Sequence, residues 1–338
     1  MKWFPRGPGL WLACLLVLIW IAVAIRMVWV PHRPAPEPLE RISIGTTASE
    51  RSALVWVAED LGLFRNSGLD VTIKTYEAGL LATREVGAGN LDVATAAEFV
   101  VVNENMQSDR PDLRIIGVIN RTDDIRIVAR RDVGITNISD LAGKRVGVLL
   151  GTDANFFLTF LCVLNRVQRT SLKAVNLNPS WQIEALTSGS VDAICVWEPF
   201  ASQAEQELGP NAVSWSGQNK VPTHWVLVCT GQGVTQRTVA VQRLLRALLA
   251  AEEFVAKDKA QAREIVQRRL RRPSPPHWWD GATPTVALDR SLVLAMEARA
   301  QWIQSTSPGT FPKIPNVLNY FAFEALKAVR PERVTIVH

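Results

Sequence analysis

The sequence lacks the clustered cysteines and histidines that a transition-metal site requires. Only four of its 338 residues are cysteine and four are histidine, and both kinds are scattered. No HExxH, P-loop or GxSxG motif is present. We therefore expect no metal, no other cofactor and no enzyme activity. Cys162, Cys195 and Cys229 lie in apolar runs, which predicts buried free thiols.

A strong excess of charge of one sign is also missing. The 37 basic and 32 acidic residues leave a formal net charge of +5, which is small for this length. The densest basic run, at 268–272, follows a periodic stretch and would suit the dipole at a helix end. Because no helix-turn-helix or RNA-binding signature accompanies it, we expect no nucleic acid partner. The 48% hydrophobic content is enough for the cores of two lobes.

A long apolar run is confined to the N-terminus. Lys2 and Arg6 precede an apolar stretch at 9–25, the order of a secretory segment. We interpret residues 1–30 as a signal peptide or a signal anchor, because a small-x-small cleavage site at 22–24 accompanies an apolar length that also suits a bilayer span. Both alternatives stay open. Trp11 stands where a lipobox has leucine, which argues against lipidation at Cys14.

After a proline-rich linker at 31–40, short β-branched runs alternate with helical patterns, which predicts an α/β fold with mainly parallel sheets. We expect residues 41–128 to form the first part of one lobe and residues 129–223 to form a second lobe. Residues 224–338 should return to the first lobe and end in helices. Apolar strands at 125–131 and 224–230 are the expected crossings of a hinge. The N-terminal segment predicts a location in the periplasm or on the extracytoplasmic face. If the segment is retained, it would anchor the protein in the inner membrane.

Four segments carry a resemblance to a known family. They are AEDLGLF with GLDV at 58–71, GNLDVA at 89–94, DLAGKRVGV at 140–148, and GSVDA running into WEPF at 189–200. Together they resemble the solute-binding proteins of ABC importers for nitrate, aliphatic sulfonates, taurine and the thiamine pyrimidine precursor, over roughly residues 41–230. The resemblance implies a periplasmic-binding-protein-like fold, with two α/β lobes, a two-strand hinge and a small-molecule ligand in the inter-lobe cleft. It implies an ABC permease and its ATPase as partners, and we expect a monomer.

The ends of predicted strands supply the first candidate ligand contacts, because open α/β sheets bind ligands at the carboxyl ends of their strands. Ala96 and Glu98 follow one such strand. After another strand, the chain passes through Gly151 into a helix, whose free amides favour anions and polar oxygens. The remaining candidates at this turn are Thr152, Asp153 and Asn155, although Thr152 could be a helix cap only.

Trp197 and Glu198 follow a further strand, and Pro199 restricts Glu198 to an extended backbone. In the resembling proteins this turn borders the ligand, where a tryptophan face stacks a ring and a carboxylate accepts hydrogen bonds. The alternative makes Trp197 a core aromatic and Glu198 a partner in lobe closure. Further candidates lie on the first-lobe side of the cleft and at the return crossing: Thr46, Thr47, Ser49 and His224.

The three candidate carboxylates, Glu98, Asp153 and Glu198, predict a ligand that is neutral or cationic, because a further negative charge would lie unpaired among them. Two alternatives come from other classes of protein. One is a membrane-tethered sensor that reports ligand occupancy to a signalling partner. The other is an enzyme similar to thiamine-pyrimidine synthases, but the helix expected at 52–63 lacks the lysine and histidine that this resemblance requires.

Overall fold

The computed structural model describes residues 20, 38–107, 112–168, 171–273, 279, 282–307, 309–311 and 313–337. Apart from Trp20 and the last residues of the linker, the predicted leader and linker lie outside this part of the chain. Contacts divide the chain into Met1–Pro38 and Leu39–His338, and only the second unit is considered below. Among the described residues, no helix combines the length and the apolarity needed to cross a membrane.

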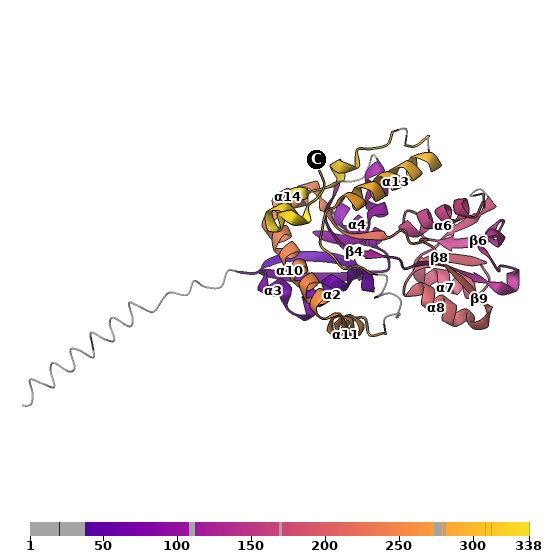
Figure 1. The fold of residues 1–338 in the computed structure, drawn as a ribbon, viewed down its shortest axis with the longest axis horizontal. Coiled ribbons are helices and arrows are strands. Elements are labelled where there is room, and N and C mark those ends of the chain that lie inside the picture. Colours follow the sequence, from indigo (N-terminus) through magenta and orange to yellow (C-terminus); the bar gives the residue numbers. More distant parts are fainter. Residues whose placement is uncertain are drawn as a thin grey trace, which may run out of the picture. The chain divides into compact units, whose positions relative to one another are not determined.

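The unit Leu39–His338 is built on two five-stranded sheets with the same pattern (Figure 1). In each sheet, three parallel strands are followed by two strands that run antiparallel to their neighbours. The first sheet, in spatial order, is β2 (Leu69–Tyr76), β1 (Glu40–Thr47), β3 (Val93–Ala97), β10 (Thr223–Thr230) and β4 (Leu113–Thr122). The second is β7 (Lys173–Asn176), β6 (Arg145–Val148), β8 (Ala193–Trp197), β5 (Ile125–Arg130) and β9 (Ala212–Ser216).

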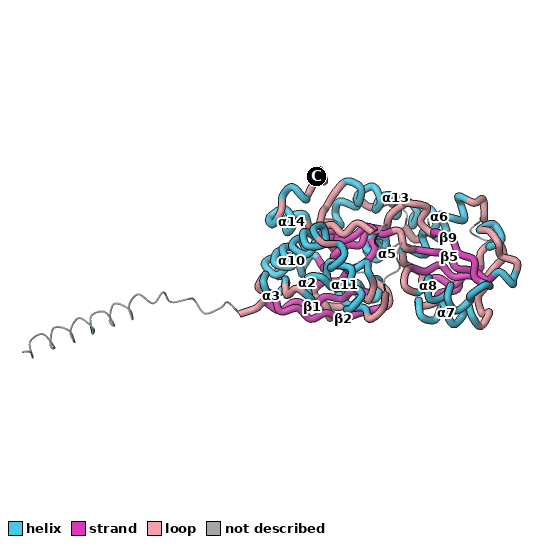
Figure 2. The backbone as a smooth tube through the Cα atoms, turned by 60° about the horizontal axis from the view of Figure 1, so that its bottom comes forward, coloured by secondary structure: helices cyan, strands magenta, loops and turns pink. Residues whose placement is uncertain are grey.

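Helices cover both sheets, as the tube view shows (Figure 2). Around the first sheet lie α2 (Ala53–Asp60), α3 (Leu63–Asn66), α4 (Gly79–Gly87), α5 (Glu98–Met106), α9 (Gly231–Gln236), α10 (Thr238–Lys257), α11 (Lys259–Leu270), α13 (Arg290–Thr306) and α14 (Phe323–Val329). The second has α6 (Asp153–Leu164), α7 (Pro179–Thr187) and α8 (Phe200–Leu208). Short 3-10 turns are η1 (Glu50–Ser52), η2 (Arg131–Val133), η3 (Ile138–Leu141), η5 (Gly209–Asn211), η6 (Val317–Tyr320) and η7 (Pro331–Arg333). The predicted two-lobed α/β architecture is confirmed.

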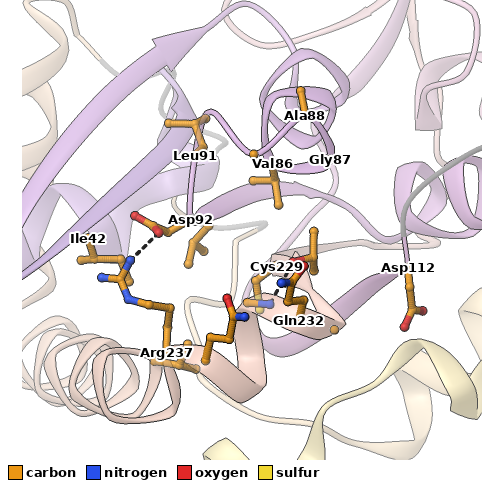
Figure 3. A pocket seen from close by; sticks show the side chains of 17 residues that line it. Ile42, Val86, Gly87, Ala88, Leu91, Asp92, Asp112, Cys229, Gln232 and Arg237 are labelled. Atoms are coloured by element: carbon orange, nitrogen blue, oxygen red, sulfur yellow. Dashed lines mark hydrogen bonds and ion pairs between the residues drawn. The ribbon is translucent and has the colours of Figure 1, made fainter.

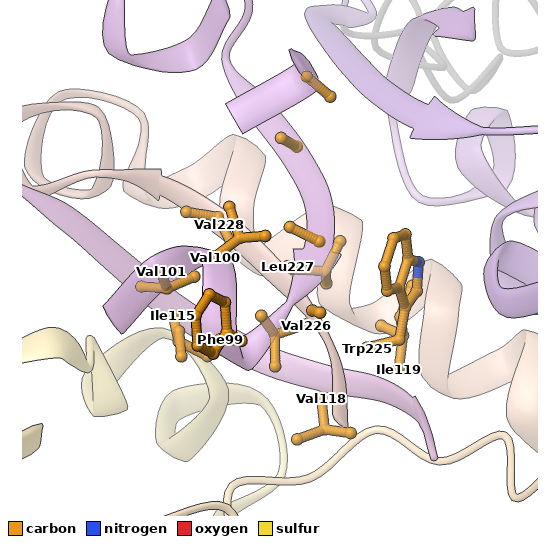
Figure 4. Packing of buried hydrophobic residues seen from close by; sticks show 14 of the residues in the cluster. Phe99, Val100, Val101, Ile115, Val118, Ile119, Trp225, Val226, Leu227 and Val228 are labelled. Atoms are coloured by element: carbon orange, nitrogen blue, oxygen red, sulfur yellow. The ribbon is translucent and has the colours of Figure 1, made fainter. Parts of the chain in front are cut away.

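The core of the first lobe forms because its central strands are apolar on both faces. All residues of β3 are buried, and β10 is buried from Thr223 to Cys229. Figure 4 shows Phe99 and Val100 of α5 packing beside Val226 and Val228 of β10. Burying one such side chain contributes about 1.5–3 kcal/mol, so this layer fixes the strand ends that face the second lobe.

The chain crosses between the lobes twice. The first crossing is the pair Asp123 and Asp124 between β4 and β5, and the second is the segment 217–222 between β9 and β10. We expected residues up to 128 to stay in the first lobe. Instead β5 already pairs with β8 and β9, so the chain enters the second sheet at Ile125. The apolar pattern of β9 is interrupted, so the sequence did not predict this strand.

Gln218 joins the two crossings. Its side-chain oxygen accepts hydrogen bonds from the backbone amides of Asp124 at 2.7 Å and Ile125 at 2.8 Å. Its Nε2 donates to the carbonyls of Thr122 and Val221. The side chain is fully buried, so it satisfies backbone groups that water does not reach. Gln218 is therefore one of the side chains that join the two crossings.

Candidate functional site

A cavity of about 220 Å³ lies between the lobes. Its walls come from the carboxyl ends of β1 and β2 in the first lobe, and from the carboxyl end of β8 in the second. This is the edge at which open α/β sheets bind ligands. The lining residues of this cleft cavity are Thr47, Ala48, Ser49, Thr75, Tyr76, Glu77, Trp197, Glu198, Pro199 and Phe200.

Glu198 and Glu77 contribute the carboxyl groups of the cleft cavity. Glu198 is 1% exposed, and its Oε2 accepts a hydrogen bond of 3.1 Å from the backbone amide of Ser202 in the first turn of α8. Glu77 is exposed and accepts a hydrogen bond of 3.1 Å from the hydroxyl of Ser180, which belongs to the other lobe. One carboxyl group is therefore fixed inside the cavity, and the other joins the two lobes at the edge of the cleft.

Behind the cavity, the side chains of Arg51, Asp124, Asp153 and Thr223 form what we call the buried network. Arg51 Nε and Nη2 each donate to Asp124 at 2.8 Å, and Nη1 donates to Asp153 at 3.2 Å. The hydroxyl of Thr223 donates to Asp153 at 3.1 Å. Arg51 is 2% exposed, with its guanidinium carbon 5.5 Å and 5.1 Å from the ring centres of Trp197 and Trp225.

The buried network joins the lobes. Arg51 belongs to the first lobe, Asp124 to a crossing, and Asp153 to the first turn of α6 in the second lobe. Burial raises the pKa of Asp153, and Arg51 opposes that shift. The carboxyl group of Asp153 therefore occupies the helix start, and Arg51 supplies its counter-charge. The Asp153 carboxyl group, which was expected to face the ligand, is therefore paired within the chain.

Glu98 forms a second buried ion pair. Its Oε1 lies 3.1 Å from Arg299 Nη2, and its Oε2 accepts a 2.9 Å hydrogen bond from the amide of His224. Burial raises the pKa of Glu98, while Arg299 lowers it. The guanidinium carbon of Arg299 is 4.1 Å from the ring centre of Phe156 in α6. This pair therefore supports contact between the lobes, and Glu98 is not among the residues lining the cleft cavity.

His224 lies against the C-terminal helices. Its Nε2 is 3.0 Å from the hydroxyl of Ser291, and the residue is 2% exposed. Burial first, and then the charge of Arg121, lower its pKa to about 4, against a smaller opposing effect of Asp289. The imidazole is therefore neutral at pH 7 and lies outside the lining of the cleft cavity.

Four of the candidate residues, Thr47, Ser49, Trp197 and Glu198, line the cleft cavity together. Their role as ligand contacts stays a prediction. Thr46 lies beneath them, where its hydroxyl is 2.6 Å from the hydroxyls of both Ser52 and Thr95. Ala96 is buried in β3 opposite Val226.

The turn before α6 lies outside the cavity lining. Gly151 has a φ of +80°, a conformation that favours glycine. The hydroxyl of Thr152 donates to the carbonyl of Leu149 at 2.6 Å and does not cap the helix. The carbonyl of Asn155 accepts from Thr159 within the helix. The role of this turn as a ligand contact stays a prediction.

Sequence reasoning missed the side chains that complete the cavity from the first lobe. Thr75, Tyr76 and Glu77 lie at the end of β2. The rule that selected the ends of the other strands applies equally to this one. Arg51 gave no such signal, because its partners are 73 and 102 residues away in the sequence.

A second cavity, of about 570 Å³, lies within the first lobe (Figure 3). It is bordered by Ile42 and Val93 near the starts of β1 and β3, and by Cys229 at the end of β10. Inside it, Arg237 donates to Asp92 at 2.7 Å. This is the edge of the sheet opposite to the one that binds ligands in open α/β folds, so we assign the candidate site to the smaller cleft cavity. Within the described residues, no group of three histidine, cysteine or acidic side chains could hold a metal ion.

Comparison with known proteins gives a family match and many structural matches. The family model described as NMT1/THI5 like matches residues 50–262. A provisionally named binding protein of Brucella abortus (strain 2308) is 22% identical over 229 residues, which cover 65% of this chain and 68% of the relative.

Among solved structures, the alkanesulfonate-binding protein SsuA of Xanthomonas axonopodis pv. citri, bound to MOPS, is 18% identical with a TM-score of 0.71, and the match covers 85% of this chain and 99% of that one. The periplasmic aliphatic sulphonate binding protein SsuA of Escherichia coli is 17% identical with a TM-score of 0.68, covering 83% and 97%. The desulfurization enzyme DSZB is 15% identical with a TM-score of 0.59, covering 87% and 99%. The fold is thus shared by binding proteins and by an enzyme.

Proposed function

We propose, from the premise that this chain belongs to the NMT1/THI5-like family, that it is an extracytoplasmic solute-binding protein of an ABC importer. It captures a small polar molecule, of the sulfonate, nitrate and taurine type or of the aminopyrimidine type, and presents it to a permease and its ATPase. The observation that carries the proposal is the cleft cavity, whose walls come from strand ends of both lobes.

Capture requires that the lobes separate, and the order of the strands supports such a motion. The crossings connect β4 to β5 and β9 to β10, and β10 and β5 are the members of these pairs that lie nearer the centre of their sheets. Strands β2 and β7 each lie three positions away from them, about 14 Å at the usual strand spacing. Glu77 directly follows β2, and Ser180, its partner, lies in the first turn of α7, the helix that follows β7. Rotation about the crossings therefore moves this contact furthest and opens the cavity.

The composition of the cavity favours binding over catalysis. Among the described residues that line it, none is a cysteine, histidine or lysine that could act as a nucleophile or base. Burial also raises the pKa of Cys162 to about 11 and that of Cys229 to about 12, and it raises the pKa of Cys195 further. These thiols therefore stay protonated and unreactive at neutral pH.

A thermal-shift screen of the full chain tests the proposal. The compounds are sulfonates, nitrate, taurine, aminopyrimidines, purines and amines, each over a range of concentrations. A bound solute at one hundred times its dissociation constant stabilises the protein by about 2.7 kcal/mol. A screen in which no small molecule raises the melting temperature contradicts solute binding.

The location is tested separately. Residues 1–45 are fused to a reporter that is active only after export, and we expect activity because of the apolar run at 9–25. The control replaces Leu15, Leu16 and Leu18 by charged residues and should lose the activity. A reporter that stays in the cytoplasm with the natural segment contradicts the proposed location.

A further inference from the structure

The first turn of α6, in the second lobe, contacts side chains of the first lobe at two points. Asp153 and Phe156 both belong to this turn, and both are buried. Because they are three residues apart in a helix, they lie on neighbouring positions of one side of α6. Each contacts a different set of first-lobe side chains, so the turn is fixed in position and in rotation.

Asp153 accepts hydrogen bonds from two donors of the first lobe. Nη1 of Arg51 donates at 3.2 Å and the hydroxyl of Thr223 donates at 3.1 Å, and both contacts end on Oδ2 of Asp153. Arg51 also donates to Asp124 at 2.8 Å from each of its two other nitrogens. Separation of the lobes therefore breaks the contacts of Asp153, whereas Asp124 keeps Arg51 on the first lobe.

Phe156 packs against the C-terminal helix α13 and against α5. The guanidinium carbon of Arg299 is 4.1 Å from the ring centre of Phe156, and the ring of Trp302 meets the ring of Phe156 edge to face at 5.5 Å. The ring of Phe99 lies 6.1 Å from the same ring. These three partners belong to the first lobe. Separation of the lobes would expose the Phe156 ring to water, which is unfavourable.

The two contact sets contribute to closure in different ways. When the lobes separate, water hydrates the Asp153 carboxyl group and offsets part of the lost ion pair. Water gives no comparable compensation to an apolar ring. We therefore expect the packing of Phe156 to supply most of the cohesion. Asp153 fixes the position of α6, because a closed arrangement without it would bury the donors of Arg51 and Thr223 away from their acceptor.

We propose that the first turn of α6 is a latch, in which Asp153 and Phe156 keep the two lobes together when no solute is bound. The predominant state of the chain is then closed, and a solute enters through a less populated open state. The inference goes beyond the proposed function, because the chain's own side chains set the balance between open and closed lobes. It also implies that the open fraction limits the apparent affinity for any solute.

The distance between the lobes tests the latch without any solute. Spin labels are attached to Lys74→Cys in β2 and Lys173→Cys in β7, which are exposed positions on the outer strands. The full chain carries Cys14→Ser, and its three described cysteines are buried. Unfolding in urea and refolding removes any copurified solute. Double electron–electron resonance should then give one predominant distance, that of the closed structure.

Variants of the latch should add a second, longer distance. Phe156→Ala removes the ring, and Asp153→Ala removes the acceptor of the two first-lobe donors. Each should raise the ratio of open to closed chains at least about tenfold, and the double variant should raise it further.

Matched controls lie in the same lobe. Val163→Ala removes an exposed apolar side chain from the same helix, and Glu184→Ala removes an exposed carboxyl group from α7. Both should keep the distance distribution of the parent chain. Circular dichroism shows whether each variant is folded, and Phe156→Leu replaces Phe156→Ala if the latter is not.

Two results overturn the latch. A parent chain that shows mainly the longer distance is open without solute, and the proposed function then stands, because open lobes can still capture a molecule. A folded double variant that keeps the single short distance shows that closure does not depend on the first turn of α6. The thermal-shift screen decides separately whether the chain binds a solute.

Discussion

The buried network and the cleft cavity both join the two lobes, but they do so with different chemistry. In the buried network, Arg51 is 2% exposed and its guanidinium nitrogens contact two carboxyl groups. In the cleft cavity, carboxyl groups and aromatic rings surround space for a ligand, and Glu77 is exposed. The buried network fills its own space with paired side chains, whereas the cleft cavity encloses a volume of about 220 Å³. Stability should depend on the buried network, and binding on the cleft cavity.

The largest effect is expected for Arg51→Met. The substitution leaves Asp124 and Asp153 buried without their counter-charge, and breaking a buried ion pair in this way costs about 3–5 kcal/mol of unfolding free energy. Urea unfolding measures the change. Arg65→Met is the control, because both side chains of its ion pair with Asp70 are exposed and such pairs contribute about 0–1 kcal/mol. Equal effects of the two variants would remove the distinction.

His224 links the same buried layer to pH. Its pKa is about 4 in the folded chain and 6.5 in the unfolded chain. Between these values the unfolded state binds more protons, so this contribution to stability is complete above pH 6.5 and is lost as the pH falls to 4. The loss is on the order of 3 kcal/mol. His224→Gln should remove this pH dependence, measured by urea unfolding from pH 4 to 7.

Gln218→Ala tests the glutamine that joins the two crossings. It leaves the amides of Asp124 and Ile125 without their acceptor, and an unsatisfied buried group costs about 1–3 kcal/mol. Gln203→Ala, which removes an exposed hydrogen bond to Glu207, is the matched control. Hydrogen exchange should also speed up at residues 122–125. Unchanged protection there would show that the hinge does not depend on this side chain.

The smallest effect is expected for one of two matched hydrogen bonds. Thr223 donates to Asp153 at 3.1 Å inside the buried network, and Ser180 donates to Glu77 at 3.1 Å at the edge of the cleft. Thr223→Val should cost about 1–3 kcal/mol of unfolding free energy, because the carboxyl group it leaves is buried. Ser180→Ala should cost less than about 0.5 kcal/mol, because water replaces the lost donor. A reversed order would contradict the assignment of the two regions.

The fold could be predicted further than the site. Apolar strands that end at motif residues, such as the one before Trp197 and Glu198, indicated both the α/β architecture and one wall of the cavity. The other wall was missed at Tyr76 and Glu77, although they also lie where a strand ends. The local sequence pattern therefore identifies where strands end. It identifies a binding site only when the ends of all strands are considered together.

The prediction of ligand charge was based on the number of candidate carboxyl groups. The sequence does not show which basic side chains pair with them. Asp153 and Glu98 were expected to act on the ligand, but Arg51 and Arg299 pair with them. These pairs join segments far apart in the sequence, and nothing local indicates them. Of these three carboxyl groups, only Glu198 lines the cavity, so the ligand charge does not follow from their number.

The most direct test of the account is a crystal structure of the chain with whichever compound raises its melting temperature most. We predict that the compound lies in the cleft cavity, between Tyr76 of the first lobe and Trp197 and Glu198 of the second, with Arg51 still paired to Asp124 and Asp153. A compound bound in the 570 Å³ cavity beside Arg237, or in the place of the Arg51 side chain, would contradict the account.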